Sequence, residues 1–123
     1  MEFNQPKGIY LQIVDQLRER ILECEWSEGE RIPSIREMAV SLGVNPNTVT
    51  KSYQTLTDRN IIENQRGLGY FVASGARKSI ISELKAEFIR DELPRVFRTM
   101  RLLEMDVDEL AHYLPRDPGD KSS

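Results

Sequence analysis

The chain has 123 residues, of which 39% are hydrophobic and 30% are charged, and its formal net charge is −3. This length accommodates one domain and an appendage, and no apolar run is long enough to span a membrane. The first residues lack the pattern of a secretory signal, and Cys24 is the only cysteine, so we expect a chain without disulfides in a reducing cytoplasm. We expect Cys24 itself to be a partly buried apolar side chain.

The charge is distributed unevenly along the chain. Residues 31–77 contain six basic and three acidic residues, whereas residues 1–30 and 78–123 are both net negative. Because contacts with phosphate groups need local positive charge, the central block is the part of the chain suited to nucleic acid.

The N-terminal part predicts one helix. Residues 1–8 are expected to be extended, because a proline and a glycine interrupt regular structure there. Apolar residues then recur every fourth position from Ile9 to Ile21, which is typical of an amphipathic helix. Its outer face is expected to carry Asp15, Gln16, Arg18, Glu19, Arg20 and Glu23. Trp26 is expected to pack beneath the turn that ends this helix.

Residues 33–56 are predicted to form two short helices joined by a tight turn. Ser34 and Glu37 have the spacing of a capping box, Gly43 supplies the turn, and Asn45 caps the second helix ahead of a proline. The exposed N-terminal face of the second helix is expected to carry Asn47, Thr48, Thr50 and Lys51. This pattern is typical of a helix-turn-helix, whose second helix enters the major groove of DNA. Two amphipathic helices that meet at a glycine without binding DNA are the alternative.

The next segment predicts a β-hairpin directly behind these helices. Asn60 is suited to end the preceding helix in a left-handed conformation, and residues 61–65 and 70–73 are predicted to be strands. Arg66 and Gly67 lie at the tip, from which a basic side chain and backbone can approach a minor groove. Three helices followed by a hairpin are the order of a winged helix. A tight turn that never touches DNA would need the same glycines.

Residues 9–73 resemble the DNA-binding domain of GntR-type bacterial transcription regulators. The strings that carry the resemblance are IYLQIVDQLRERI, GERIPSIREMAVSLGVNPNTVTKSYQTL and NIIENQRGLGYFV. The resemblance implies that Arg36 reads a base or clamps a phosphate, and that Asn45, Asn47, Thr48 and Gly67 contact DNA. Pro46 and Asn60 depart from the family pattern, which often has Arg or Ser at the first position and Gly at the second. The predicted DNA-binding residues are Ser34, Arg36, Asn45, Asn47, Thr48, Thr50, Lys51, Arg66 and Gly67.

The C-terminal part predicts a long amphipathic helix from residue 78, which Pro94 should kink or interrupt, and a short last helix capped by Asp106. This short two-helix tail resembles that of the YtrA subfamily. Its apolar stripe has no large partner within the chain, so we expect it to pair with a second copy. The predicted dimerisation residues are Ile81, Leu84, Phe88, Val96, Phe97, Met100 and Leu103. The alternative is that the helix folds back on its own domain.

The expected fold is mainly α-helical with a small β-hairpin. We expect a winged helix-turn-helix domain at residues 1–75, a helical dimerisation region at 76–114 and a disordered tail at 115–123. The expected function is sequence-specific regulation of transcription, and the resemblance implies a repressor. A homodimer is expected to bind a near-palindromic operator in double-stranded DNA. A protein-interaction module that uses the same scaffold without DNA is the competing hypothesis.

No catalytic, metal or cofactor site is predicted. His112 is the only histidine, which excludes histidine triads and multi-histidine metal sites. The start of a helix explains Asp106, Asp108 and Glu109, and the glycines at the hairpin tip lack the spacing of a phosphate-binding loop. The operator, the regulated genes and the existence of a small-molecule effector do not follow from the sequence.

Overall fold

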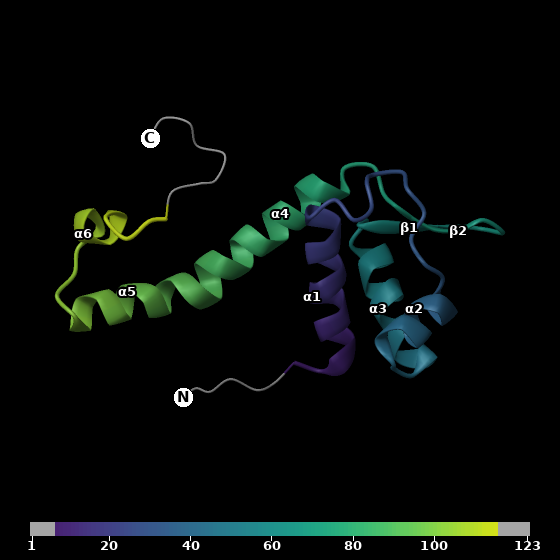
Figure 1. Ribbon diagram of the computed structural model, residues 1–123, viewed down its shortest axis with the longest axis horizontal. Helices are drawn as coiled ribbons and strands as arrows, with labels where there is room; N and C mark the ends of the chain where they lie inside the picture. Colours follow the sequence, from purple (N-terminus) through teal and green to yellow (C-terminus); the bar gives the residue numbers. More distant parts are fainter. Residues whose placement is uncertain (1–6, 116–123) are drawn as a thin grey trace. The chain divides into compact units, whose positions relative to one another are not determined.

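The computed structural model describes residues 7–115 (Figure 1). The chain divides into two compact units between Glu83 and Leu84, and each unit is described by itself. Residues 1–6 of the predicted extended segment and residues 116–123 of the predicted disordered tail lie outside the described residues. No helix within residues 7–115 has the length and apolar content to cross a membrane.

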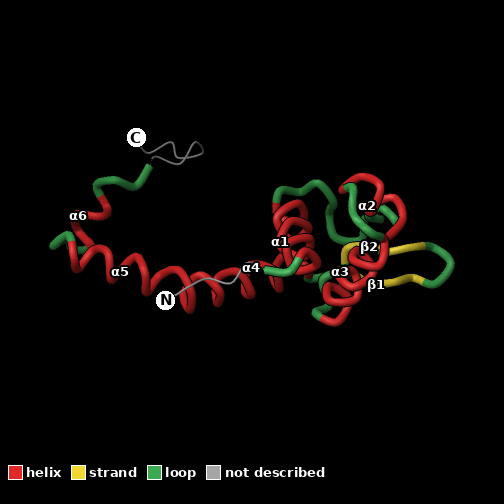
Figure 2. Tube along the Cα trace, turned by 90° about the horizontal axis from the view of Figure 1, so that it is seen from below, coloured by secondary structure: helices red, strands yellow, loops and turns green. Residues whose placement is uncertain are grey.

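Three helices form the core of the first unit: α1 (Ile9–Leu22), α2 (Ile35–Leu42) and α3 (Pro46–Asp58). Helix α3 packs against both α1 and α2, and Figure 2 shows the three helices beside the hairpin. Apolar side chains at three- and four-residue spacing fill the space between them, as their periodicity predicts. The buried set includes Ile13, Val14, Leu17, Ile21, Met38, Ala39, Val49, Tyr53 and Leu56.

The ends of α2 and α3 have the capping interactions that the sequence predicts. Ser34 Oγ accepts the backbone N–H of Glu37 at 3.1 Å, and the Glu37 carboxylate accepts the N–H of Ser34 at 2.9 Å. Gly43 ends α2 with a φ of 68°, in the left-handed region that favours glycine. Asn45 Oδ1 accepts the N–H of Asn47 at 2.8 Å. These bonds satisfy N–H groups that have no partner inside the helices, and they fix where each helix begins.

The predicted hairpin follows α3. Strands β1 (Ile62–Gln65) and β2 (Gly69–Val72) pair antiparallel, with Ile62 opposite Val72. Asn60 precedes the hairpin with a φ of 61°, so the predicted left-handed end of α3 is confirmed.

The other edge of β2 is paired as well. The N–H of Ile32 donates to the carbonyl oxygen of Tyr70 at 2.9 Å, and the N–H of Val72 donates to the carbonyl oxygen of Glu30 at 2.9 Å. Residues 30–32, between α1 and α2, therefore act as a short third strand of the wing. This pairing ties the hairpin to the segment that leads into α2.

The prediction that Arg18 lies on the outer face of α1 is wrong, because its side chain is only 2% exposed. Arg18 Nη1 donates to Glu83 Oε1 at 2.9 Å, and Nη2 donates to Asp15 Oδ1 at 2.9 Å. Glu83 belongs to α4 (Ala76–Glu87), the helix that follows the wing. A position that faces solvent in α1 alone is covered once this later helix packs over it.

Cys24 is exposed, so the prediction of a partly buried side chain is wrong. The residue follows the end of α1 with a φ of 66°, and the N–H of Glu25 donates to the carbonyl oxygen of Arg20 at 2.9 Å. This is a left-handed helix end of the kind that glycine usually forms. Trp26 is buried as predicted, and the guanidinium carbon of Arg20 lies 4.5 Å from its ring centroid.

Helix α4 begins on a carboxylate from a distant loop. Glu28 accepts the N–H of Gly75 at 2.8 Å and the N–H of Arg77 at 3.1 Å. Arg77 Nη1 donates in turn to the carbonyl oxygen of Leu22, the last residue of α1, at 2.7 Å. The start of α4 is therefore joined to the segment between α1 and α2 as well as to the wing.

In the second unit, the end of α4 continues into a π-helical turn, η1 (Phe88–Glu92), and then into α5 (Leu93–Leu102). Pro94 lies in the first turn of α5. Proline has no N–H and crowds the carbonyl four residues earlier, and the wide π turn accommodates it without ending the helix. The predicted interruption near Pro94 is confirmed.

A last helix, α6 (Val107–Ala111), completes the described part of this unit. Asp106 caps it as predicted, because its carboxylate accepts the N–H of Glu109 at 2.8 Å. Met100 of α5 is buried, and an apolar cleft of about 340 Å³ lies between Met100 and Leu110 of α6.

Candidate nucleic-acid interface

Helix α3 presents its first turns to solvent and buries the opposite face. The exposed residues here are Asn45, Pro46, Asn47, Thr50 and Lys51, and Thr48 is half-buried. The buried residues are Val49, Ser52, Tyr53 and Leu56. The structure thus brings the predicted recognition residues together at one end of one helix.

Two side-chain hydroxyls anchor α3 to its neighbours. Ser52 Oγ donates to the carbonyl oxygen of Tyr10 in α1 at 2.8 Å, and Tyr53 Oη donates to the carbonyl oxygen of Pro33 at 2.7 Å. The Tyr53 ring also meets the Tyr70 ring of β2 edge to face, with centroids 4.9 Å apart. Burial raises the pKa of Tyr53 above its ordinary value, so its hydroxyl keeps the proton that it donates. These contacts hold α3 in place before any DNA arrives.

The first turn of α2 places a cation beside α3. Arg36 is exposed there, next to the capping box. Ser34 Oγ accepts one N–H in this box, and its side chain also lowers the pKa of Glu37 by a hydrogen bond, so Ser34 is engaged in the cap. The N–H of Ser34 holds the pKa of Glu37 below its ordinary value, so this carboxylate is ionised and committed to the cap.

Two of the predicted DNA-binding residues, Lys51 and Thr50, interact with other groups of the protein. Lys51 Nζ lies 4.2 Å from the ring centroid of Tyr10, so this lysine lies on the side of α3 next to α1. Thr50 Oγ1 donates to the carbonyl oxygen of Pro46 at 3.0 Å. The hydroxyl of Thr50 therefore retains acceptor capacity toward an outside donor, such as the amino group of a base.

The turn between β1 and β2 forms the predicted basic tip. Arg66 and Gly67 are both exposed. The φ angles of Gly67 and Gly69 are 80° and 117°, a backbone that residues with a Cβ rarely adopt. The turn thereby presents both a guanidinium and bare backbone to solvent.

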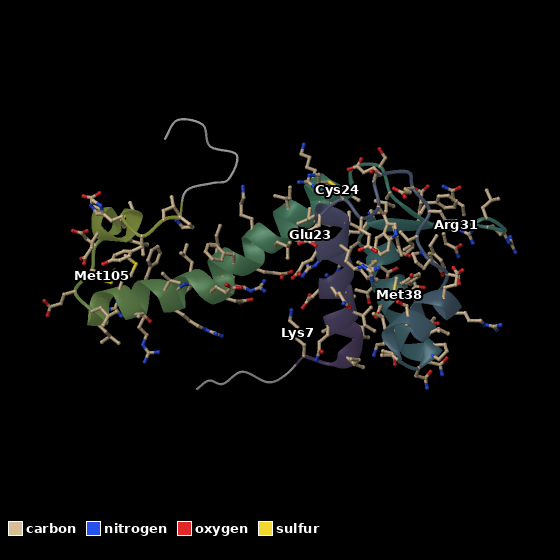
Figure 3. The ribbon with its side chains drawn as sticks, viewed as in Figure 1. Lys7, Glu23, Cys24, Arg31, Met38 and Met105 are labelled. Atoms are coloured by element: carbon tan, nitrogen blue, oxygen red, sulfur yellow. The ribbon has the colours of Figure 1, made fainter. Side chains whose placement is uncertain are left out.

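Arg31 is a basic residue of this surface that the helix-turn-helix pattern does not reveal. It lies opposite Phe71 in the third-strand pairing, and a Cβ added to Gly69 would be 2.9 Å from Arg31 Nε. Figure 3 shows Arg31 beside the hairpin. The alternation of exposed Arg31 with buried Ile32 is the signal of an edge strand, but two residues before a proline are too few for the pattern to be recognised.

Most of the predicted dimerisation residues are exposed in the single chain. The exposed fraction is 38% to 63% for Ile81, Phe88, Val96, Phe97 and Leu103. Leu84 is half-buried, and Met100 is covered within its own unit. Ile81 belongs to the first unit and the other six to the second.

The fold and this exposed basic surface define a winged helix-turn-helix DNA-binding protein. Groove and phosphate contacts require an exposed helix N-terminus together with basic side chains on the preceding helix and at the wing tip. The sequence model of the bacterial regulatory proteins of the gntR family matches residues 9–72, about half of the chain. The chain belongs to this GntR family, which confirms the resemblance seen in its motifs.

Similarity extends beyond the family domain. The chain is 38% identical over 109 residues to the uncharacterised HTH-type transcriptional regulator YhcF of Bacillus subtilis, across 89% of this chain and 88% of that protein. It is 30% identical over 112 residues to the HTH-type transcriptional repressor YtrA of the same organism, across 91% and 85% of the two chains. A crystal structure of a GntR-family regulator from Bacteroides thetaiotaomicron matches with 42% identity and a TM-score of 0.73, across 85% of this chain and 91% of that one. The chain is therefore a DNA-binding transcriptional regulator and not an enzyme.

Proposed function

We propose that the chain is a homodimeric repressor that binds a near-palindromic operator, with one α3 helix in each of two major grooves. One observation carries the proposal: the chain has both an exposed α3 N-terminus and a row of exposed apolar side chains on its C-terminal helices. Repression is supported by the similarity to YtrA, which is named a repressor. The place of action is the cytoplasm.

The side chains of the interface divide by chemistry. We assign Arg36, Ser34 and Arg66 to phosphate oxygens. The two arginines present donors and positive charge, and Ser34 lies beside Arg36 at the start of α2. The amide of Asn47 can pair with an adenine edge in the major groove. The oxygen of Asn45 is used in the cap, which leaves its NH₂ group to donate to a base or a phosphate. We assign Thr48 to the same groove.

The apolar row is the dimer contact in this proposal. Phe88, Val96 and Phe97 expose apolar surface to water in the single chain, and association of two copies would remove that surface from water. A two-fold interface uses the same patch on both subunits, so one row suffices. Met100 is buried and lines the same cleft as Val96, so in this proposal it belongs to the inner side of the contact.

Selection of bound sequences from a random duplex pool, with the full chain at a stated salt concentration, tests the operator. The expected result is an enriched inverted repeat whose half-site centres are separated by about one helical turn, about 34 Å, or a multiple of it. An enriched single half-site would contradict the dimeric mode. Absence of any enriched sequence would contradict sequence-specific binding.

Sedimentation velocity tests the dimer contact. Phe97→Glu is expected to convert a dimer into a monomer and to weaken binding to the full operator while leaving binding to a half-site intact. Val107→Glu is the matched control, because Val107 is 66% exposed on α6 and lies outside the predicted row. A monomeric wild type at micromolar concentration would contradict the proposal.

Transcription in vitro tests repression. A template with the selected operator overlapping its promoter is expected to yield less transcript as the protein is added. A template with a scrambled operator should be unaffected. More transcript from the operator template would identify an activator.

A further inference from the structure

The third strand of the wing carries a cation on its outer face. Arg31 lies opposite Phe71, and the neighbouring Ile32, which points to the other face, is buried. Side chains two residues apart along a strand share a face, so Phe71 and Gly69 lie on the same side of β2 as Arg31. Arg31 itself is exposed.

The guanidinium of Arg31 occupies the space that Gly69 leaves open by having no side chain. A Cβ added to Gly69 would be 2.9 Å from Arg31 Nε, 3.4 Å from Nη2 and 3.5 Å from Cζ, so the guanidinium lies directly against the glycine backbone. Any other residue at position 69 would both displace this group and strain a backbone whose φ is 117°. The missing side chain at position 69 therefore gives the guanidinium room beside the wing.

The charges around Arg31 define the surface to which it belongs. Arg31 lies three residues before Ser34, the cap of α2, and its charge lowers the pKa of Glu37 further after two hydrogen bonds from Ser34. Glu63 faces Phe71 from β1 and is the acidic side chain on the same face of the wing. Arg31 is thus five residues before Arg36 in the chain and pairs with Phe71, two residues along β2 from Gly69 at the hairpin turn.

We propose that Arg31 binds a DNA phosphate between the groove entered by α3 and the groove approached by the wing, and that Gly69 leaves the space that its guanidinium needs for this contact. The inference rests on the proposed operator-binding surface and adds to it a residue outside the helix-turn-helix. In this proposal the guanidinium contacts the backbone of the duplex and not a base edge. Arg31 therefore contributes affinity and orientation without sequence preference.

Fluorescence anisotropy with the full chain tests the contact, with the selected operator and an unrelated duplex titrated at several salt concentrations. Arg31→Ala is expected to weaken binding to both duplexes by the same factor. It should also reduce the magnitude of the slope of log K against log salt by about 0.9 for each bound protomer. Lys78→Ala is the control, because Lys78 is an exposed cation of the same unit outside this surface. It should change neither the affinity nor the slope.

A double-mutant cycle tests the role of Gly69. Gly69→Ala should reproduce part of the loss in affinity and in slope caused by Arg31→Ala. Its effect on the slope should disappear in the Arg31→Ala background, because the strain of a Cβ at a φ of 117° neutralises no phosphate. Circular dichroism at the assay temperature establishes that each variant is folded.

An unchanged salt slope for folded Arg31→Ala would overturn the proposal, even if affinity falls, because a merely structural role would not alter the number of phosphates neutralised. A loss confined to the operator would overturn it as well, since it would indicate base readout. Failure of the proposed function would give a different result. The wild type would bind both duplexes equally or as a monomer, while Arg31→Ala would still lower the salt slope.

Discussion

Arg18 of α1 and Glu83 of α4 form an ion pair, with 2.9 Å between Nη1 and Oε1, although the arginine is almost fully buried. Asp15 supplies a second carboxylate to the same guanidinium at 2.9 Å. A buried charge is tolerated only when it is paired, and here two carboxylates accept from the two Nη groups. The link also attaches the first turns of α4 to the DNA-binding unit through charge as well as apolar packing.

Removal of the Glu83 charge should destabilise this unit. Glu83→Gln is expected to lower the free energy of unfolding by about 1–3 kcal/mol, less than for a fully buried pair because the glutamate is partly exposed. Urea denaturation followed by the fluorescence of Trp26 measures the effect. Glu19→Gln, an exposed carboxylate on α1, is the control and should leave the midpoint unchanged. Equal midpoints for both variants would show that the ion pair contributes no net stability.

Tyr53→Phe should lower stability by about 1 kcal/mol at neutral pH, because it removes the hydrogen bond to Pro33 and leaves a carbonyl oxygen without its partner. The same variant has a defined pH dependence. Burial raises the pKa of Tyr53 in the folded state, whereas the unfolded state ionises near the ordinary value of about 10. The contribution of Tyr53 is therefore complete below about pH 10 and is lost as the pH rises further.

Guanidinium unfolding midpoints at neutral and strongly alkaline pH test this prediction. The stability difference between wild type and Tyr53→Phe should narrow above about pH 10, since only the wild type has this group to ionise on unfolding. Tyr113→Phe alters an exposed tyrosine and should leave the alkaline slope of the wild type in place. A difference that stays constant with pH would show that the Tyr53 hydroxyl ionises alike in both states.

Cys24→Gly should stabilise the protein by about 0.5–1 kcal/mol, because Cys24 has a φ of 66° and glycine relieves the strain of that conformation. Asn60→Gly should give a smaller gain, since asparagine tolerates the left-handed region better. Thermal unfolding under reducing conditions measures both. Cys24→Ala removes the thiol and keeps the strain, so it should give no gain; an equal gain would assign the effect to the side chain.

Glu28 should anchor the start of α4 only while it is ionised. The N–H groups of Gly75 and Arg77 lower its pKa, so its contribution is present above the ordinary value of about 4.3 and is lost as the pH falls through the lower folded value. NMR titration should show the two amide resonances moving together with an apparent pKa below that ordinary value. Glu28→Gln should abolish this transition, whereas Glu19→Gln should not. A transition that persists in Glu28→Gln would belong to another carboxylate.

The helix-turn-helix was predictable because its determinants are local. Ser34, Glu37 and Gly43 act on backbone groups within a few residues, and the apolar spacing of α2 and α3 needs no knowledge of what they pack against. The hairpin was predictable for the same reason. The exposed end of α3 followed from these elements, which is why most of the candidate DNA contacts lie where the motif predicts them.

The features that were missed depend on distant partners. The burial of Arg18 requires Glu83, 65 residues later in the chain, and nothing in the period of α1 signals it. The position of Arg31 depends on pairing with β2, and the contact of Lys51 with Tyr10 depends on how α1 packs on α3. In each case the sequence shows the residue type, but it does not show which distant residue will lie next to it in the fold.

The π turn has a consequence for how this chain can change in length. Phe88 and Val96 are eight residues apart, which is more than two turns of regular α-helix. The wider turn at Phe88–Glu92 takes up the excess, so the two side chains stay close to one line along the helix. Elsewhere in a helix, one inserted or deleted residue would rotate every later side chain by about 100°. Here a residue can be lost, if Pro94 is replaced as well, and Phe88 and Val96 would still lie on one side of the helix.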